Sequence, residues 1–471
     1  MASTKFNLGY MIFLSFVAAI GGLLFGYDTA VISGTISQVT EQFQLDALQQ
    51  GWYVGCALVG SICGVMFAGM LSDRLGRKWV MIIAALLFSI SGIWCAASSD
   101  FNHLIAARIL GGIAIGVVSI VSPLYISEVA AAHYRGRLVS LYQVAVTVGF
   151  LGAYIANFYL LTFSQSGFES GEAWFNKIFV SEVWRGMLGM ESVPAILFLI
   201  TILFIPESPR WLIVAQKEDQ ARKVLQNIYL TNSEAQAQIE QTKAVLANEH
   251  QSSWSMLWQP GILKAVIIGV CIAMLGQFMG VNAVLYYGPS IFEDAGLSGG
   301  DSLFYQILIG AVNMITGILA LLIIDKIGRK KLIYYGVSGM IVSLIAIGIY
   351  FVTGEKLNLS NTYLLFFFLA YIFFCAGSIS AVIFVLLSEM YPTKIRGLAM
   401  SVAGLSLWVG TYLIGQLTPW MLESLTPGGT FFLFAFMCIP YMLIVWKLMP
   451  ETAGKTLEEI ELFWTGQKCK S

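Results

Sequence analysis

The stretch Asp73-Arg74-Leu75-Gly76-Arg77-Lys78 returns in the second half of the chain as Asp325-Lys326-Ile327-Gly328-Arg329-Lys330. Two further motifs repeat in the same order. Glu128, with Arg135-Gly136 after it, recurs as Glu389 with Arg396-Gly397, and Pro206-Glu207-Ser208 recurs as Pro450-Glu451-Thr452. Three matches in one order indicate that the chain consists of two duplicated halves.

The composition indicates that these halves lie in a membrane. Hydrophobic residues make up 58% of the 471 residues and charged residues 11%, whereas soluble domains contain about 25% charged residues. Twelve apolar segments are each long enough to cross a hydrocarbon layer of about 30 Å as a helix, so we expect an all-α membrane protein with twelve transmembrane helices. The predicted spans are 8–36, 51–72, 79–98, 104–127, 138–163, 186–205, 262–292, 303–324, 332–353, 362–387, 398–421 and 429–449.

One long polar stretch divides the chain. Six apolar segments precede residues 207–260 and six follow, and within this stretch 221–225 and 234–246 are predicted to form short amphipathic helices. We therefore expect a six-helix half at 1–206, a cytoplasmic helical linker at 207–260, a second six-helix half at 261–449 and a cytoplasmic tail at 450–471. Because six helices separate the copies of each motif, both copies emerge on one side, as in parallel repeats of the major facilitator type.

Charge distribution predicts the orientation. Nearly all of the 26 Lys and Arg residues fall in loops and tails on the side of both termini, which the positive-inside rule makes cytoplasmic. The first apolar segment is too long for a secretory signal, lacks a cleavage site and carries Asp28, so we expect a retained helix. The cysteines lack the paired spacing of disulfides or zinc sites and are interpreted as packing residues.

The repeated turns predict a cytoplasmic gate. Glycine allows each turn to reverse sharply, and the turn cations can pair with Glu128 and Glu389 of neighbouring helices. The alternative is that these cations only set the topology. The predicted gate residues are Asp73, Arg77, Glu128, Arg135, Asp325, Arg329, Glu389 and Arg396.

Three charges lie inside predicted spans at a similar depth: Asp28, Arg108 and Glu191. An ionised residue in the middle of a spanning helix costs roughly 2.5 to 3.5 kcal/mol, so such residues usually have a partner or a function. One arginine beside two carboxyl groups can keep one of them ionised while the other takes up a proton. The cluster is predicted to carry a proton, and a purely structural buried salt bridge is the alternative.

The motifs together resemble the sugar porter family of the major facilitator superfamily over nearly the whole chain. The resemblance rests on the repeated turns, on Pro206-Glu207-Ser208-Pro209-Arg210-Trp211 and on Pro450-Glu451-Thr452-Ala453-Gly454-Lys455-Thr456. It implies a monosaccharide transporter of a plasma membrane, such as a bacterial inner membrane, that functions as a monomer. Expected partners are the sugar, a proton and membrane lipid, with no nucleic acid, cofactor or metal.

Two stretches are similar to the proton-coupled xylose symporters of that family: Gly26-Tyr27-Asp28 and Ala107-Arg108-Ile109-Leu110-Gly111-Gly112. Uniporting members carry asparagine where this chain has Asp28. The resemblance therefore implies proton-coupled symport. An uncoupled facilitator and a transporter of a polyol such as inositol remain alternatives.

Sugar hydroxyls need side chains that both donate and accept hydrogen bonds, together with aromatic surface. Four amides lie within apolar spans, and they match sugar-binding positions of the family, although any one of them can instead bridge two helices. The predicted sugar-binding residues are Gln143, Gln277, Asn282, Tyr286, Asn313, Trp408 and Phe384. The glycines around Gln277 permit bending, and the following Tyr286-Tyr287-Gly288-Pro289 suggests an extracellular gate.

The chain also departs from the family pattern. Gly276 replaces the first of two paired glutamines, Phe384 replaces a tryptophan, Ser380-Ala381 replaces a Gly-Pro pair, and Phe150 and Leu407 replace polar contacts of the xylose symporters. These changes favour broad monosaccharide recognition, with a sugar that binds in a different pose as the alternative. A membrane enzyme is disfavoured because the three histidines lie far apart and no hydrolase motif occurs, and a sugar receptor is disfavoured because the tail is short.

Overall fold

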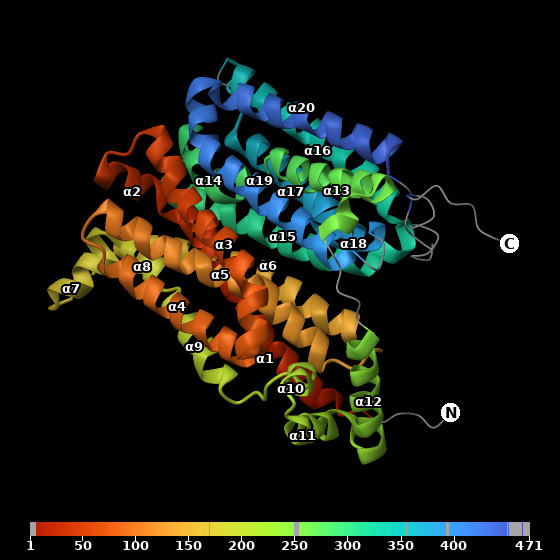
Figure 1. Cartoon of the computed structure of the whole chain (residues 1–471). Helices are drawn as coiled ribbons and strands as arrows, with labels where there is room; N and C mark the ends of the chain where they lie inside the picture. Colours follow the sequence, from red (N-terminus) through yellow and green to blue (C-terminus); the bar gives the residue numbers. More distant parts are fainter. Residues whose placement is uncertain are drawn as a thin grey trace. The chain divides into compact units, whose positions relative to one another are not determined.

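The computed structural model describes residues 6–168, 170–248, 254–354, 356–391, 395–449, 451 and 464. Within these ranges every regular element is a helix (Figure 1). The described residues contain twelve helical spans that are long and apolar enough to cross a membrane, which confirms the predicted number. Most of them extend up to a turn beyond the predicted limits, because polar caps and loop residues continue the helical backbone.

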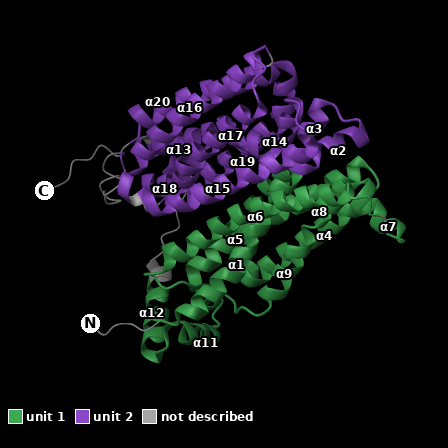
Figure 2. Cartoon of the chain, turned by 180° about the vertical axis from the view of Figure 1, so that it is seen from behind, with its two compact units in different colours: residues 1–32, 56–251 green, residues 33–55, 252–471 purple. Residues whose placement is uncertain are grey.

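The chain separates into two compact units (Figure 2). Unit 1 contains residues 1–32 and 56–251, and unit 2 contains residues 33–55 and 252–471. Residues 33–55 therefore pack within unit 2, although they precede most of unit 1 in the chain.

The first six spans begin with helix α1. Their bounds are α1 (Leu8–Val31), α3 (Ala47–Leu75), α4 (Arg77–Ala97), α5 (Phe101–Val129), α6 (Arg135–Ser164), and α8 (Val183–Gly189) continued by α9 (Ser192–Ile202). The other six are α13 (Pro260–Phe278) continued by α14 (Val281–Asp294), α15 (Gly299–Ile327), α16 (Arg329–Thr353), α17 (Asn361–Gly377) continued by α18 (Ile379–Met390), α19 (Arg396–Ser424) and α20 (Thr426–Lys447).

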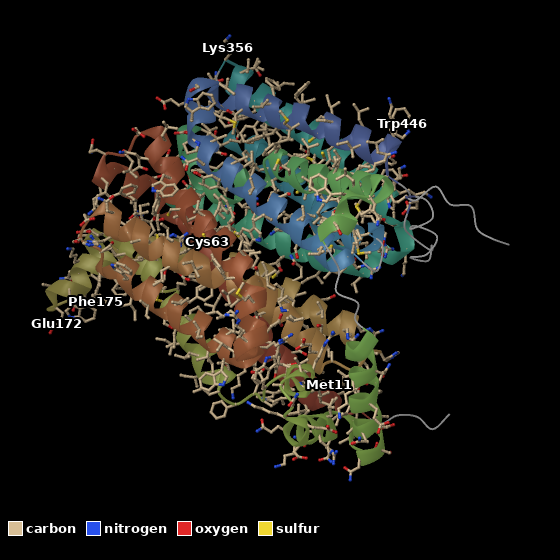
Figure 3. All side chains as sticks on the ribbon, viewed as in Figure 1. Met11, Cys63, Glu172, Phe175, Lys356 and Trp446 are labelled. Atoms are coloured by element: carbon tan, nitrogen blue, oxygen red, sulfur yellow. The ribbon has the colours of Figure 1, made fainter. Side chains whose placement is uncertain are left out.

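Short elements connect the spans. They are η1 (Ile32–Gly34), α2 (Ile36–Phe43), α7 (Ala173–Asn176), η2 (Lys177–Ser181), α10 (Pro209–Val214), α11 (Glu218–Tyr229), α12 (Asn232–Asn248) and η3 (Trp254–Trp258). The two helices predicted at 221–225 and 234–246 are confirmed as α11 and α12. Figure 3 labels Phe175 on α7. Its ring contacts Phe163, Phe168 and Phe179, so an aromatic cluster ties this short helix to the end of α6.

Three spans that the sequence predicts as single helices are interrupted. Between α8 and α9 the break follows from Pro194, which has no N–H for the carbonyl of Met190. Between α13 and α14, Gly280 takes a φ of +88°, and an added Cβ would lie 2.4 Å from the ring of Phe434. Between α17 and α18 the break is at Ser378. The sequence contains a signal at each break: Pro194, Gly280, and Gly377 directly before Ser378.

Glycines bring α3 and α5 into backbone contact within unit 1. A Cβ added at Gly112 of α5 would lie 2.0 Å from the carbonyl oxygen of Ala57, and one added at Gly60 of α3 would lie 2.3 Å from that of Ile109. Gly64 and Gly116 repeat this contact one turn further on. Paired small-residue motifs of this kind let membrane helices pack closely. The contact sets the position of α5, which carries Arg108.

We expect Gly112→Ala to lower the free energy of unfolding by about 1 to 3 kcal/mol, because the added methyl group overpacks a contact between two backbones. The matched control is Gly152→Ala on α6, where an added Cβ meets nothing within 4 Å. Thermal unfolding of the two purified variants in detergent measures the difference. Equal melting temperatures would show that the α3–α5 crossing tolerates a wider spacing.

Candidate functional site

The structure brings the three predicted intramembrane charges together in unit 1. Asp28 lies near the end of α1, Arg108 lies on α5, and Glu191 lies at the break between α8 and α9. Their exposed fractions are 0%, 2% and 1%. The guanidinium of Arg108 donates to Asp28 Oδ1 in a buried ion pair.

Small residues make room for this cluster. Ser91 on α4 donates to the carbonyl of Ala107 over 2.8 Å, which fixes α4 against α5. A Cβ added at Gly111, one turn after Ala107 on α5, would lie 2.6 Å from Ser91 Oγ and 3.8 Å from Asp28 Oδ2. Glycine at position 111 is therefore required for the approach of α4 and also leaves space beside the Asp28 carboxylate.

The cluster holds more carboxyl groups than cations. Asp28 Oδ2 and Glu191 Oε1 are buried and have no hydrogen-bond partner among the described residues, and Glu191 interacts electrostatically with both Asp28 and Arg108. With both carboxyl groups ionised, the three side chains carry a net negative charge, which is costly where no water solvates it. A single bound proton would remove that net charge.

Two of the predicted amides contact each other in unit 2, across the break between α13 and α14. Asn282 Nδ2 donates to Gln277 Oε1 over 2.7 Å. Thr411 on α19 donates to the same oxygen over 3.1 Å, and its hydroxyl also lies 2.9 Å from the carbonyl of Leu407. Because both contacts use Oε1, the amide orientation of Gln277 is set and its Nε2 is available as a donor.

The remaining predicted sugar-binding residues differ in exposure. Asn313 on α15 is half-buried and has no hydrogen-bond partner among the described residues, and Trp408 on α19 is half-buried. Tyr286 is 3% exposed, whereas Phe384 on α18 is 51% exposed. Gln143 lies on α6 of unit 1 with an exposed side chain. An amide exposed in the middle of a span is more stable beside water or a ligand than beside lipid.

The apolar replacements are packed side chains. Phe150 is 8% exposed, and its ring meets that of Tyr154 edge to face at 6.3 Å. Leu407 is half-buried. The sequence analysis missed Thr411, although its position one turn after Trp408 on a predicted span was a signal that could have found it.

In unit 1 the repeated turn forms a network of charges. Arg77 donates to both carboxylate oxygens of Glu128 at 3.0 Å and to Asp73 at 3.2 Å. The Arg77 and Glu128 side chains are only 9% and 4% exposed. Glu128 also accepts from the hydroxyl of Ser208. This geometry is the two-pronged pairing that orients both groups most strongly.

The corresponding turn in unit 2 repeats the central pair. Arg329 donates to Glu389 over 3.1 and 2.8 Å. The side chain of Asp325 lies outside the described residues. Arg135 is exposed, and no described carboxylate lies within 4.0 Å of it. Among the described residues, Arg396 donates only to the carbonyl of Tyr391, over 3.5 Å. The two turn arginines pair as the motif suggested, and the two later arginines lie apart from the carboxylates.

The sequence analysis also missed the role of the repeated Pro-Glu motif. Glu207 accepts from the backbone N–H groups of Arg77, Lys78 and Ser208 at 2.8 to 3.1 Å. Burial raises the pKa of Glu207, and these three N–H groups oppose the increase. In unit 2, Glu451 accepts from the backbone N–H of Lys330 over 3.2 Å. The recurrence of the glutamate in both halves was the available signal.

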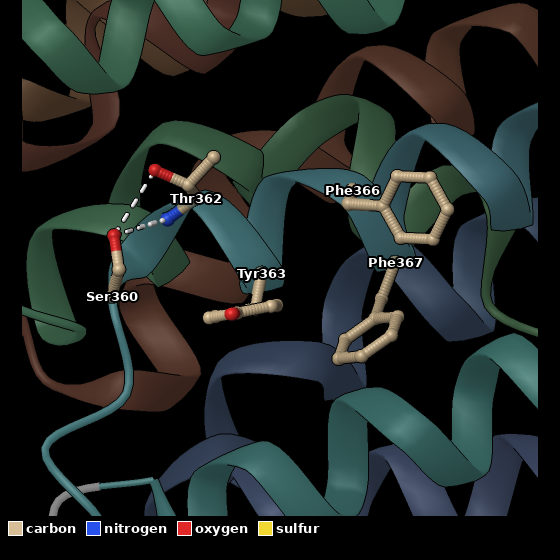
Figure 4. A pocket seen from close by; sticks show the side chains of 5 residues that line it. All are labelled: Ser360, Thr362, Tyr363, Phe366 and Phe367. Atoms are coloured by element: carbon tan, nitrogen blue, oxygen red, sulfur yellow. Dashed lines mark hydrogen bonds between the residues drawn. The ribbon is translucent and has the colours of Figure 1, made fainter.

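One hollow of about 730 Å³ lies on the surface of unit 2 at the start of α17. The residues that line it are Ser360, Thr362, Tyr363, Phe366 and Phe367 (Figure 4). The hydroxyl of Ser360 donates to that of Thr362 over 3.0 Å. It contains none of the predicted sugar-binding residues. The described residues contain no group of three His, Cys, Asp or Glu side chains that could hold a metal ion.

Comparison with known proteins identifies relatives over nearly the whole chain. The family model described as "Sugar (and other) transporter" matches residues 14–464. The arabinose-proton symporter of Bacillus subtilis is 38% identical over 461 residues, which cover 97% of this chain and 96% of that protein. The D-xylose-proton symporter of Escherichia coli is 34% identical over 502 residues, which cover 100% of this chain and 99% of that protein. The inward open conformation of the xylose transporter XylE from E. coli matches with a TM-score of 0.83 at 33% identity, covering 97% of this chain and 100% of that chain.

We expect Arg77→Met to lower the free energy of unfolding by about 3 kcal/mol, because it leaves the buried carboxylate of Glu128 without its cation. The double variant Arg77→Met with Glu128→Leu removes both charges and should recover more than half of this loss. Melting temperatures of the wild type, the single variants and the double variant provide the test. If the two single losses simply add, the pair is not coupled.

Proposed function

The chain belongs to the sugar transporter family, and from this premise we propose how its own residues carry a sugar together with a proton. The protein is a multi-pass membrane protein and a proton-coupled monosaccharide symporter that works by alternating access, not an enzyme. Among its own features, the observation that carries the coupling is the buried Asp28–Arg108 ion pair beside Glu191.

We propose that this cluster is the proton carrier. When Asp28 is ionised it binds Arg108, and Glu191 holds the proton that neutralises the cluster. A second proton that reaches Asp28 removes its charge and releases Arg108, whose guanidinium then binds the Glu191 carboxylate as Glu191 gives up its proton. Because each arrangement neutralises the buried charges differently, proton binding favours one set of helix positions over another.

We propose that the amides bind the sugar. Gln277 presents its Nε2 donors because Asn282 and Thr411 occupy its oxygen. Asn313 and Gln143 offer further donors and acceptors, and Trp408, Tyr286 and Phe384 offer aromatic surface for the apolar face of the ring. The apolar Phe150 and Leu407 reduce the number of direct polar contacts, which supports recognition of several pentoses and hexoses rather than of xylose alone.

Alternating access requires contacts that break and re-form. Within unit 2, Ser37 of α2 donates to Glu293 of α14 over 2.6 Å, and Gln416 of α19 donates to the carbonyl of Leu48 over 2.9 Å. We propose that these contacts of residues 33–55 close the extracellular side and that they separate when it opens. The paired arginines and glutamates of the repeated turns serve as the cytoplasmic gate.

We also propose the orientation, location, domain organisation and oligomeric state of the chain. The excess of Lys and Arg in the loops on the side of both termini supports cytoplasmic termini in a plasma membrane, such as a bacterial inner membrane. The halves 1–206 and 261–449, joined by a linker at 207–260 and followed by a tail at 450–471, form one transport unit that functions as a monomer surrounded by lipid.

Asp28→Asn should abolish accumulation of sugar against a gradient, because the amide cannot take up the proton, while exchange of sugar across the membrane without a gradient continues. Accumulation is measured as uptake of labelled arabinose, xylose and glucose into vesicles with an imposed proton gradient. Exchange is measured as counterflow in the same vesicles. The matched control is Asp219→Asn at an exposed site on α11. Accumulation by the Asp28→Asn protein that a protonophore abolishes would contradict the role of Asp28.

Replacing Gln143, Gln277, Asn282 or Asn313 with alanine should each weaken binding of the preferred sugar by about 1 kcal/mol or more, which is at least about fivefold, because one buried hydrogen bond is lost. Thr411→Val should weaken it less, because it removes only one of the two contacts that orient Gln277. Gln165→Ala, at an exposed position, serves as the control. Wild-type affinity in all four alanine variants would place the sugar site elsewhere.

A further inference from the structure

Helix α14 contains a proline whose missing donor is replaced from another helix. Pro289 has no N–H, so it cannot form the helical hydrogen bond to the carbonyl of Leu285, four residues earlier. Gln306 of α15 donates its Nε2 to this carbonyl over 3.1 Å and lies 3.4 Å from the carbonyl of Val284. The side-chain amide thus occupies the place of the backbone donor that proline lacks.

The surroundings of Gln306 fit this contact. The side chain is 0% exposed, and a Cβ added at Gly288 would lie 2.1 Å from Gln306 Oε1. Only glycine at position 288 therefore allows the amide to reach the α14 backbone. Gln306 Oε1 has no hydrogen-bond partner among the described residues. An amide with one unpaired atom is costly inside a span. The bond from Gln306 Nε2 to the Leu285 carbonyl is therefore the contact that explains why a glutamine stands at position 306.

The same device recurs where α14 meets α19. Pro419 cannot donate to the carbonyl of Gly415, four residues earlier. Tyr287 of α14 donates its hydroxyl to that carbonyl over 2.6 Å. Gln306 therefore supports α14 at its proline, and α14 in turn supports α19 at its proline. Asn282 and Tyr286 lie on α14 and Trp408 lies on α19, so three of the residues proposed to bind sugar stand on the two supported helices.

We propose that Gln306 is a positioning residue for the sugar site. By replacing the donor that Pro289 lacks, it holds α14 in the direction that places Asn282 and Tyr286 for binding. This inference rests on the proposed function. Gln306 is not itself a sugar ligand, because it is fully buried and its amide nitrogen is engaged by backbone carbonyls. The half-buried Asn313, two turns later on α15, is the amide on that helix proposed to contact sugar.

A double-mutant cycle between positions 289 and 306 tests the proposal. Pro289→Ala restores an N–H that can bond to the Leu285 carbonyl within the helix, so the amide is no longer needed. Gln306→Met keeps the size of the side chain and removes the donor. We expect Gln306→Met to weaken sugar binding by about fivefold or more when residue 289 is proline and by less than about twofold when it is alanine.

The matched control is Ser302→Ala, one turn earlier on α15, where the hydroxyl is fully buried but has no hydrogen-bond partner among the described residues. It should change binding by the same factor in both backgrounds. An equal effect of Gln306→Met with proline and with alanine at position 289 overturns the proposal.

Thermal unfolding of the same four proteins separates this outcome from a failure of the proposed function. If the wild type binds no sugar, the proposed function fails, but the loss of melting temperature caused by Gln306→Met must still shrink in the Pro289→Ala protein. Should Pro289→Ala not fold, Gly288→Ala replaces it. Its methyl group displaces the amide, so it should weaken binding by about fivefold in the wild type and by less than about twofold when Gln306→Ser has already removed the contact. A full additional loss in the Gln306→Ser protein would refute the positioning role.

Discussion

A bilayer supplies no water for the carbonyl groups that a broken or proline-containing helix leaves without an N–H donor, so the protein must satisfy them from within. The described spans meet this constraint with single side chains. Asn157 donates to the carbonyl of Val31 where α1 ends, and Tyr371 donates to that of Met279 where α13 ends. Gln306 and Tyr287 do the same at the two prolines of α14 and α19. These four irregularities are thus each tied to a neighbouring helix.

The irregularities coincide with the chemistry. Glu191 lies in the break that Pro194 creates, and Asn282 bonds to Gln277 across the break at Gly280. A continuous helix presents its side chains only at fixed angles, whereas a break re-aims them and frees backbone groups at the same time. Because the side chains that satisfy those backbone groups come from adjacent helices, a substrate that shifts one broken helix acts on its neighbours through directional bonds. Local binding energy can then favour one arrangement of the spans over another.

Much of this architecture could be predicted from the sequence, for reasons that differ between residues. The twelve spans follow from hydropathy, and the Arg77–Glu128 and Arg329–Glu389 pairs follow from repeated motifs whose chemistry leaves few other partners. Asp28, Arg108 and Glu191 could be placed at one depth because charges are so rare in spans. Thr411 and Gln306 could not be assigned a role, because a threonine or glutamine in a span has many possible partners and the choice depends on helix rotation. The association of residues 33–55 with unit 2 depends on long-range packing that no local pattern encodes.

The two duplicated halves differ in the polar groups that they bury, and this difference follows from what each group must do. Both halves keep the arginine–glutamate pair of the repeated turn, which under the proposed function forms and breaks as the cytoplasmic gate. Under the proposed function, the buried charges of unit 1 take up and release a proton, which requires a site where one arginine is shared between two carboxyl groups. The amides of unit 2 stay neutral at every pH of interest, so they can bind hydroxyl groups without changing the charge of the membrane interior. Had both halves carried charges, the cost of burying them would have doubled without a second proton to neutralise them. Under the proposed function, the duplicated scaffold thus binds two unlike substrates, the proton at the charges of unit 1 and the sugar at amides that lie mainly in unit 2.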